Sequence, residues 1–181
     1  NDLLVNYNKG FGDFSLNLSA GGNMLTQQWY GQNQNNGFLL KPNLFTVTNA
    51  GGLYISEYGA TKKLNSVYGF ATLGYKNYLF LDVTARNDWS STLPPDAWSY
   101  FYPSVGLTWV VSDMFKSSMP GWLTFAKLRA SYAQVGNDTD PYQLKPEFSF
   151  YQGGTNGYAS RGGTQPATEL KPEITTSQEI G

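Results

Sequence analysis

The 181-residue sequence contains neither cysteine nor histidine. This absence excludes disulfide bonds, zinc sites built on cysteine, a Ser-His-Asp triad and a Cys-His nucleophile pair. Charged residues are also scarce, at 14%, where a soluble protein has roughly 25%. The formal net charge is −1, so the chain has no basic surface for nucleic acid and we expect no such partner.

Long apolar runs are missing as well. No run approaches the length of about 18 apolar residues that predicts a transmembrane helix. Residues 1–7 are strand-like and lack the basic, apolar and cleavage-site regions of a signal peptide. The mean hydropathy of −0.38 is still compatible with a membrane β-barrel, because half of each barrel strand is polar.

Alternation of polar and apolar residues is the main pattern that is present. It is clearest where Leu79, Leu81, Val83 and Ala85 alternate with Asp82, Thr84, Arg86 and Asp88. A period of two indicates a β-strand. The alternating segments run to about 10 residues or more, against about 5–6 for the average strand of a globular protein, and about 10 is the length that crosses a bilayer.

The connections between the expected strands differ in length. Seven strands are expected, at residues 3–9, 14–20, 66–75, 79–88, 101–112, 122–133 and from 173 onward. Short turns follow the first and third strands and a modest linker, residues 113–121, follows the fifth, whereas longer loops occupy residues 26–62, 90–99 and 136–172. Short turns at one end and long loops at the other are typical of outer-membrane barrels. The sequence therefore predicts an all-β, antiparallel up-and-down transmembrane β-barrel, of which about seven strands are present.

Aromatic residues, 16% of the chain, are expected near both ends of these strands. Tyr75, Tyr78, Trp122 and Phe125 fall at the short-turn end, and Trp89, Trp98, Tyr100 and Phe101 at the long-loop end. Aromatic belts mark the two membrane interfaces. The alternative interpretation is the aromatic-rich core of a soluble β-sandwich.

Successive positions along each expected strand point to opposite faces of the sheet, so the side chains can be assigned to two faces. We expect Leu81, Val83, Val105, Leu107, Leu128 and Ala130 to face lipid, and Asp82, Arg86, Asp88, Thr108, Lys127 and Arg129 to line the lumen. The charged residues are interpreted first as ion pairs between neighbouring strands, worth about 0.2–1 kcal/mol each. They could also line a solute path or contact a plug. Asp82 and Asp88, about 20 Å apart along one strand, are too distant for acid–base catalysis on a glycoside, and we expect no enzymatic activity.

Residues 137–140 carry the oxygen ligands that calcium prefers. Asn137 and Asp138 also end a strand shortly before Pro141, where Asn and Asp are ordinary turn formers. The turn is the favoured interpretation, and we expect no metal and no cofactor.

Three segments carry a resemblance to a known family. They are Ala85-Arg86-Asn87-Asp88-Trp89-Ser90-Ser91-Thr92-Leu93-Pro94, Tyr100-Phe101-Tyr102-Pro103-Ser104-Val105 and Leu128-Arg129-Ala130-Ser131-Tyr132-Ala133-Gln134-Val135-Gly136-Asn137-Asp138. In this order and spacing they resemble the barrel of the SusC/RagA family of TonB-dependent outer-membrane transporters from Bacteroidetes. The end of the chain, Leu170-Lys171-Pro172-Glu173 and Thr175-Thr176-Ser177-Gln178-Glu179-Ile180-Gly181, resembles the start of that family's next strand.

The resemblance implies a location in the outer membrane of a Gram-negative bacterium. It implies that residues 1–181 are a segment of one barrel domain, without counterparts of the family's plug domain or TonB-contacting box. The implied partners are the plug and the other barrel strands, a SusD-like surface lipoprotein, TonB, membrane lipid, and a glycan or peptide substrate. Because an open edge is unstable in a membrane, we expect strands from elsewhere to pair with residues 3–9 and 173–181.

The long loops are the expected recognition surface. Trp29 and Tyr30 stand among glutamine and asparagine residues, and Tyr151 and Tyr158 have similar neighbours. Amides and aromatic rings together suit sugars, and these four residues are candidates for contact with the substrate or the partner lipoprotein. A solvated or partner-covered loop is the plainer interpretation. A soluble β-sandwich that binds carbohydrate is the alternative function.

Overall fold

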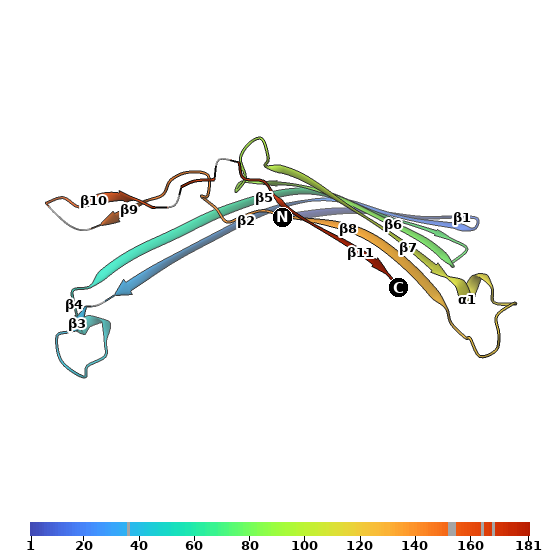
Figure 1. Ribbon diagram of the computed structural model, residues 1–181, viewed down its shortest axis with the longest axis horizontal. Helices are drawn as coiled ribbons and strands as arrows, with labels where there is room; N and C mark the ends of the chain where they lie inside the picture. The colour runs from blue at the N-terminus through green and yellow to red at the C-terminus, as the bar shows by residue number, and fades with distance from the viewer. Residues whose placement is uncertain (36, 152–154, 164, 168) are drawn as a thin grey trace. The chain divides into compact units, whose positions relative to one another are not determined.

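The computed structural model describes residues 1–35, 37–151, 155–163, 165–167 and 169–181. Seven strands form one antiparallel sheet in the order β1-β2-β5-β6-β7-β8-β11 (Figure 1). Their bounds are β1 Asp2–Phe11, β2 Phe14–Asn35, β5 Tyr54–Tyr75, β6 Leu79–Ser90, β7 Ser99–Val110, β8 Lys127–Asn137 and β11 Glu173–Ile180. Each strand pairs with its sequence neighbours within this set, so the predicted up-and-down arrangement is confirmed.

The chain divides into two compact units. The first consists of residues 1–25 and 63–181, and the second is Thr26–Lys62. The second unit contains the short strands β3 Phe38–Leu39 and β4 Ala50–Gly51 and the 3-10 helix η1 Val47–Asn49. Helix α1 Val111–Met114 and the hairpin of β9 Phe148–Tyr151 and β10 Tyr158–Arg161 belong to the first unit. No helix in the described residues is long and apolar enough to cross a membrane.

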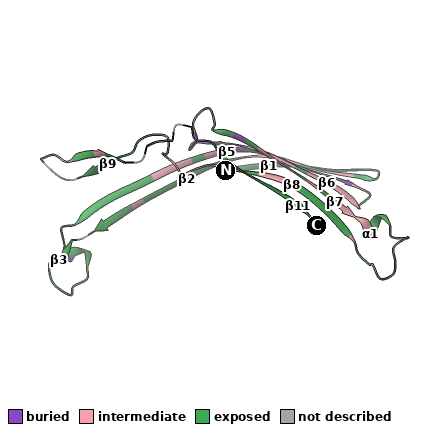
Figure 2. Cartoon of the chain, viewed as in Figure 1, coloured by how far each residue is buried: buried purple, intermediate pink, exposed green. Residues whose placement is uncertain are grey.

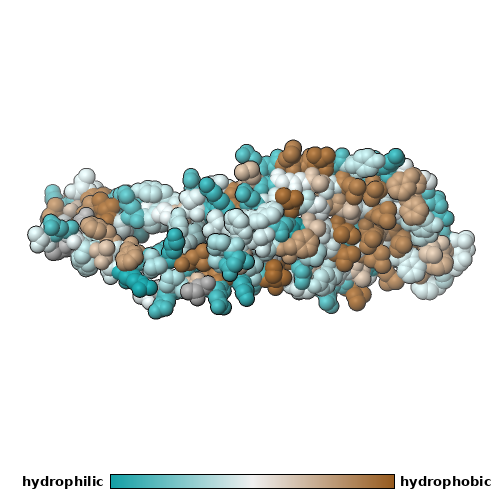
Figure 3. Space-filling view, turned by 90° about the horizontal axis from the view of Figure 1, so that it is seen from above, coloured by the Kyte–Doolittle hydropathy of each residue, from teal (hydrophilic) through white to brown (hydrophobic). Residues whose placement is uncertain are grey.

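The register separates two chemically different faces of the sheet in the first unit. Leu81 lies opposite Leu107, and Leu107 lies opposite Ala130, so these side chains share one face. Figure 3 shows apolar side chains gathered on one side of this sheet. The same register places Asp82, Arg86, Asp88, Thr108, Lys127 and Arg129 together on the opposite face.

The sheet has almost no apolar core of its own. Leu93 and Tyr100 are the buried hydrophobic residues in the described chain, and most of the sheet is exposed or half-buried (Figure 2). On the apolar face Val83 remains 40% exposed and Leu107 46% exposed. A sandwich packs two apolar faces against each other, whereas this face is left open, as expected of a surface that meets lipid.

Two tight turns join strands at the short-turn end. Gly12, with φ of 62°, lies in the turn between β1 and β2. Lys76 and Asn77 have φ of 49° and 61°, and two successive positive values define the type I′ turn that suits the twist of a hairpin. The predicted short turns are therefore confirmed.

Aromatic rings form a row at this end. The ring centroids of Phe11 and Phe14 are 6.1 Å apart, those of Phe14 and Tyr75 4.8 Å, and those of Tyr75 and Tyr78 5.6 Å. The row crosses from β1 to the start of β6 and contains Tyr75 and Tyr78, two of the four aromatic residues expected at this end.

The prediction for residues 26–62 was wrong in part. These residues were expected to form one long polar loop, but β2 and β5 extend into them and are 22 residues long each. Their outer halves are mostly exposed and show no regular alternation of polar and apolar residues. A strand that buries neither face keeps its backbone hydrogen bonds without alternating in hydropathy, so the sequence pattern gives no signal there.

The linker after β7 also differs from the prediction. Val111 and Ser112 were expected to end a strand, but they begin α1, and β8 starts at Lys127 rather than at Trp122. The register of β7 with β8 reaches only the pair Val110 and Lys127. Beyond this pair the N–H of Ser112 in α1 donates to the carbonyl of Ala126 at 3.1 Å, but β7 does not continue alongside residues 122–125. Trp122 is 82% exposed in this connection.

Candidate functional site

The polar face of the sheet carries a row of rings and charges across neighbouring strands. Arg86 on β6 lies directly opposite Tyr68 on β5 and Tyr102 on β7. The guanidinium carbon of Arg86 is 5.7 Å from the ring centroid of Tyr68. Its Nη2 donates a hydrogen bond of 2.9 Å to Oγ of Ser66, and the Tyr68 hydroxyl donates to the carboxylate of Asp2 on β1. The row thus connects strands from β1 to β7.

Asp88 is the anion at the centre of this row. Its side chain is only 4% exposed. Oδ1 accepts a 2.7 Å hydrogen bond from Nε of Arg86, and Oδ2 accepts one of 2.7 Å from the Tyr102 hydroxyl. Both carboxylate oxygens are therefore satisfied, as burial of a charge requires.

Two glycines make room for the rings of this row. A Cβ atom on Gly21 of β2 would lie 2.7 Å from the ring of Tyr68. A Cβ atom on Gly136 of β8 would lie 2.5 Å from the ring of Tyr100. The Tyr100 and Tyr102 rings are stacked, with centroids 6.0 Å apart. The rings thus lie over glycine on the neighbouring strands.

The structure brings together only some of the predicted lumen-lining residues. Arg86 and Asp88 form an ion pair, but along one strand rather than between neighbouring strands as predicted. Asp82 instead accepts a 2.6 Å hydrogen bond from the hydroxyl of Thr72 on β5. Lys127 and Arg129 lie on β8, at the level of Val110 and Thr108.

Sequence reasoning missed the tyrosines of the row. The alternation along β7 is enough to place Tyr100 and Tyr102 on the same side of that strand, because they are two positions apart. Their meeting with Asp88 depends on the register of β6 with β7, which pairs Arg86 with Tyr102 and Asp88 with Tyr100. Two strands joined by a loop as long as residues 90–99 do not reveal that register.

The predicted loop residues belong to different units of the chain. Trp29 and Tyr30 are consecutive on β2 in the second unit and are 43% and 70% exposed. Glu57 on β5 raises the pKa of the Tyr30 hydroxyl, chiefly through their hydrogen bond. Tyr151 and Tyr158 lie opposite each other in the β9–β10 hairpin, with rings stacked at 5.4 Å, and both are at least half exposed. Adjacent residues of a strand point to opposite faces, so Trp29 and Tyr30 cannot share one contact surface.

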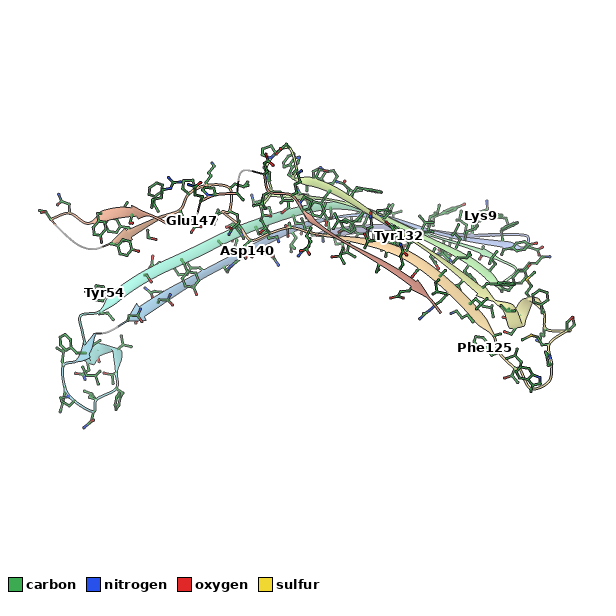
Figure 4. All side chains as sticks on the ribbon, in the orientation of Figure 1. Lys9, Tyr54, Phe125, Tyr132, Asp140 and Glu147 are labelled. Carbon is green, nitrogen blue, oxygen red and sulfur yellow. The ribbon has the colours of Figure 1, made fainter. Side chains whose placement is uncertain are left out.

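The segment proposed as a turn or calcium site begins where β8 ends. Asp140 and Phe125 lie at opposite ends of β8 (Figure 4). Asp138 accepts hydrogen bonds from the Ser90 and Thr92 side chains. In the described part of the chain, no three acidic side chains are grouped so as to hold a metal ion.

Comparison with known proteins places this arrangement in a family. The family model for the TonB dependent receptor-like β-barrel matches residues 1–181. The chain belongs to this family. The resemblance inferred from the three motif segments is thereby confirmed, and so is the barrel fold.

Two curated TonB-dependent receptors of Formosa agariphila are similar to this barrel segment. P39 is 28% identical over 143 residues, which cover 76% of this chain and 14% of P39. P26 is 36% identical over 86 residues, which cover 46% of this chain and 8% of P26. The barrel segment therefore spans a small part of the length of these relatives.

Solved structures of a transporter show the same fold. The RagAB peptide transporter matches 99% of this chain with a TM-score of 0.83 at 17% identity, and the match covers 20% of that chain. The RagAB peptide importer in its closed-closed state matches 99% of this chain and 20% of that chain, with a TM-score of 0.78 at 17% identity.

Proposed function

We propose that this barrel segment is part of an outer-membrane TonB-dependent transporter. Its apolar face, with Leu81, Val83, Val105, Leu107, Leu128 and Ala130, meets lipid, and its polar face lines the lumen. The observation that carries this proposal is the contrast between the two faces. One face leaves Leu107 exposed, whereas the other satisfies Asp88 within a hydrogen-bonded row.

The charged residues of the polar face have different roles in this proposal. Arg86 and Asp88 hold neighbouring strands together through Ser66, Tyr68 and Tyr102. Asp82, Lys127 and Arg129 line the path along the barrel interior. The charges act by position and not by catalysis, since the family is one of receptors and transporters.

The transported solute in this proposal is a glycan or a peptide, imported with a SusD-like lipoprotein and energised through TonB. The RagAB neighbours are named as peptide transporters or importers, which supports a peptide. The exposed aromatic rings of the loops suit a glycan as well, because rings stack on both sugars and peptide side chains. In this proposal the plug and the remaining strands are other parts of the full-length transporter, and TonB binds outside residues 1–181.

Trp29, Tyr30, Tyr151 and Tyr158 are the proposed contacts with the solute or the lipoprotein. Tyr151 and Tyr158 provide one stacked pair of rings on a short hairpin. Trp29 and Tyr30 present rings on opposite faces of β2, so one of them is available to each side of the strand.

Uptake by the full-length transporter tests this proposal. A strain that lacks the transporter gene is grown on a panel of single glycans and defined peptides, and a solute whose use requires the gene is chosen. The double variant Trp29→Ala, Tyr30→Ala should raise the half-saturating solute concentration without lowering the amount of folded barrel. Trp122→Ala, an exposed ring at the short-turn end, is the control and should leave uptake unchanged.

Two results would count against the proposal. If no solute in the panel depends on the gene, the assignment as a nutrient transporter fails. If the double variant transports with unchanged kinetics, the loops are solvated and the recognition role of Trp29 and Tyr30 is withdrawn.

A further inference from the structure

The most deeply buried residues of the chain gather around the loop between β6 and β7. Ser90 is fully buried, and Thr92 and Leu93 are 2% and 4% exposed. Asp88 and Tyr100, at the adjoining strand ends, are 3% and 6% exposed. Such burial is unusual for a loop, which normally lies at the surface with mobile side chains.

On one side this loop is attached to the end of β8. The carboxylate of Asp138, the residue after β8, accepts a hydrogen bond from the Ser90 hydroxyl through Oδ2. Oγ1 of Thr92 lies 3.4 Å from the same oxygen, and the Ser90 and Thr92 hydroxyl oxygens are 2.9 Å apart. Hydrogen bonds to a charged acceptor are stronger than those between neutral groups.

On the other side the loop is attached to β5. The backbone N–H of Ser91 donates to the carbonyl of Lys63 at 2.9 Å, and the N–H of Lys63 donates to Oγ of Ser91 at 2.9 Å. At the base of the loop, the N–H of Ser90, the last residue of β6, donates to the carbonyl of Trp98 at 2.9 Å. The loop therefore bonds to the strands that flank the β6–β7 hairpin on both sides.

We propose that Asp138 is a positioning residue that holds the β6–β7 loop as a fixed brace. The brace joins three adjacent hairpins, which are β2–β5, β6–β7 and β8–β11. The brace consists of Ser90, Ser91 and Thr92, bonded to Lys63 on one side and to Asp138 on the other. The inference rests on the proposed function only in taking this end of the strands as the substrate side. The loop held in this way consists of residues 91–98, between the end of β6 and the start of β7.

The brace also gives a physical reason for the sequence motifs. Ser90 and Thr92 belong to the first segment that resembles the family, Tyr100 to the second and Asp138 to the third. The third segment lies more than 20 residues beyond the second in the sequence, and the fold brings it to the loop that the first two segments flank. The motif residues thus specify how neighbouring hairpins are joined at the substrate side.

Spin-label mobility in the full-length transporter tests the brace. Asp96, an exposed residue of the same loop, is changed to Cys and labelled with a nitroxide, after replacement of any cysteine outside this segment. Asp138→Ala should shorten the rotational correlation time of the label by at least about twofold, as expected when a held loop becomes free on the nanosecond timescale. Asp140→Ala removes an exposed carboxylate two residues further on and is the matched control, for which no change is expected.

Milder variants keep the test decisive if Asp138→Ala fails to fold. Thr92→Val removes one hydroxyl at nearly constant volume, and Asp138→Asn keeps one acceptor oxygen, so both should give an intermediate mobility. The fraction of folded barrel, read from its heat-modifiable band on a gel, should stay at the level of the unsubstituted protein. Measuring the label mobility and the folded fraction together distinguishes positioning of the loop from a general loss of structure.

The outcomes are distinct from those of the uptake assay. An unchanged label in folded Asp138→Ala, or an equal change in Asp140→Ala, would overturn the brace. A mobile label in Asp138→Ala and Thr92→Val with normal folding supports it. Failure to find a transported solute would leave the mobility result standing, because the label reports the loop and not the solute.

Discussion

Arg86 and Asp88 form an ion pair along a single strand, with Nε of Arg86 2.7 Å from Oδ1 of Asp88. The two residues are separated by one position on β6 and therefore point to the same face. The Asp88 side chain is 4% exposed and that of Arg86 is 36% exposed. The pair is thus buried at its anionic end and open at its cationic end. Asp88 is therefore the residue whose charge must be met by hydrogen-bond donors around it.

Removal of the Asp88 carboxylate should destabilise the barrel. Asp88→Ala leaves Arg86 and the Tyr102 hydroxyl without their acceptor, and we expect a loss of about 2–4 kcal/mol in the free energy of unfolding. Asp82→Ala removes a carboxylate that accepts one hydrogen bond from Thr72 and should cost about 1 kcal/mol. Urea titration of the full-length barrel in lipid vesicles measures both. Equal losses in the two variants would contradict the central role of Asp88.

Two glycines of the sheet should respond differently to the same change. A Cβ at Gly136 would lie 2.5 Å from the ring of buried Tyr100, whereas a Cβ at Gly106 would be in ordinary contact, 3.9 Å from Cβ of Asp82. Gly136→Ala should therefore cost about 1–3 kcal/mol through overpacking, and Gly106→Ala should be close to neutral. The same urea titration compares them. A neutral Gly136→Ala would show that the Tyr100 ring is free to move.

The second unit depends on one buried amide. Nδ2 of Asn49 donates to the carbonyls of Lys41 and Leu44 at 2.7 and 2.8 Å, and Oδ1 accepts from the N–H of Lys41 at 2.9 Å. Asn49→Ala removes three hydrogen bonds worth about 1 kcal/mol each, so cleavage by chymotrypsin at the exposed ring of Phe45 should be at least about tenfold faster. Thr48→Ala, which removes one exposed hydroxyl contact, is the control. Equal cleavage rates in the two variants would refute the role of Asn49.

The turn between β5 and β6 makes a pH-dependent contribution to the stability of the folded barrel. Nζ of Lys76 is 3.3 Å from the carboxylate of Asp13, and hydrogen bonding to Asp13 raises the pKa of Lys76 above its ordinary value of 10.5. A raised pKa stabilises the folded state below the unfolded value, and this stabilisation is lost as the pH rises through the folded pKa. Lys76→Asn removes the ammonium but tolerates the positive φ of the turn.

The measurement is the difference in stability between the unsubstituted barrel and Lys76→Asn. It should be constant from about pH 7 to pH 9 and should shrink above about pH 10.5. A difference that grows with pH, or that is unaffected by pH up to 12, would mean that the ammonium of Lys76 contributes nothing. High salt should also reduce the difference, because both side chains are exposed.

The sequence was sufficient for the fold where one face of a strand meets a different environment from the other. In β6 the alternation of Leu81 and Val83 with Asp82 and Thr84 located the strand and assigned its faces. The short turn at Lys76 and Asn77 also predicted that β5 and β6 form a hairpin. It did not give the register, because a two-residue loop would pair Tyr75 with Tyr78, whereas the structure pairs Tyr75 with Leu79.

The sequence was insufficient where both faces of a strand are exposed. The outer part of β2, around Trp29, and of β5, around Tyr58, buries neither face, and its side chains carry no periodic signal. The clusters at Asp88 and Asp138 were missed for another reason. Each depends on contacts between segments joined by long loops, and the register across such loops comes from the packing of the whole sheet.

Spin-label accessibility at two neighbouring residues tests the central claim most directly. Val83 and Thr84 are consecutive on β6 and point to opposite faces. A nitroxide at Val83→Cys in the full-length transporter in lipid bilayers should collide mainly with oxygen, which concentrates in lipid, and one at Thr84→Cys mainly with a water-soluble nickel complex. The reverse order, or equal access of both reagents at the two sites, would contradict the assignment of the apolar face to lipid and of the polar face to the lumen.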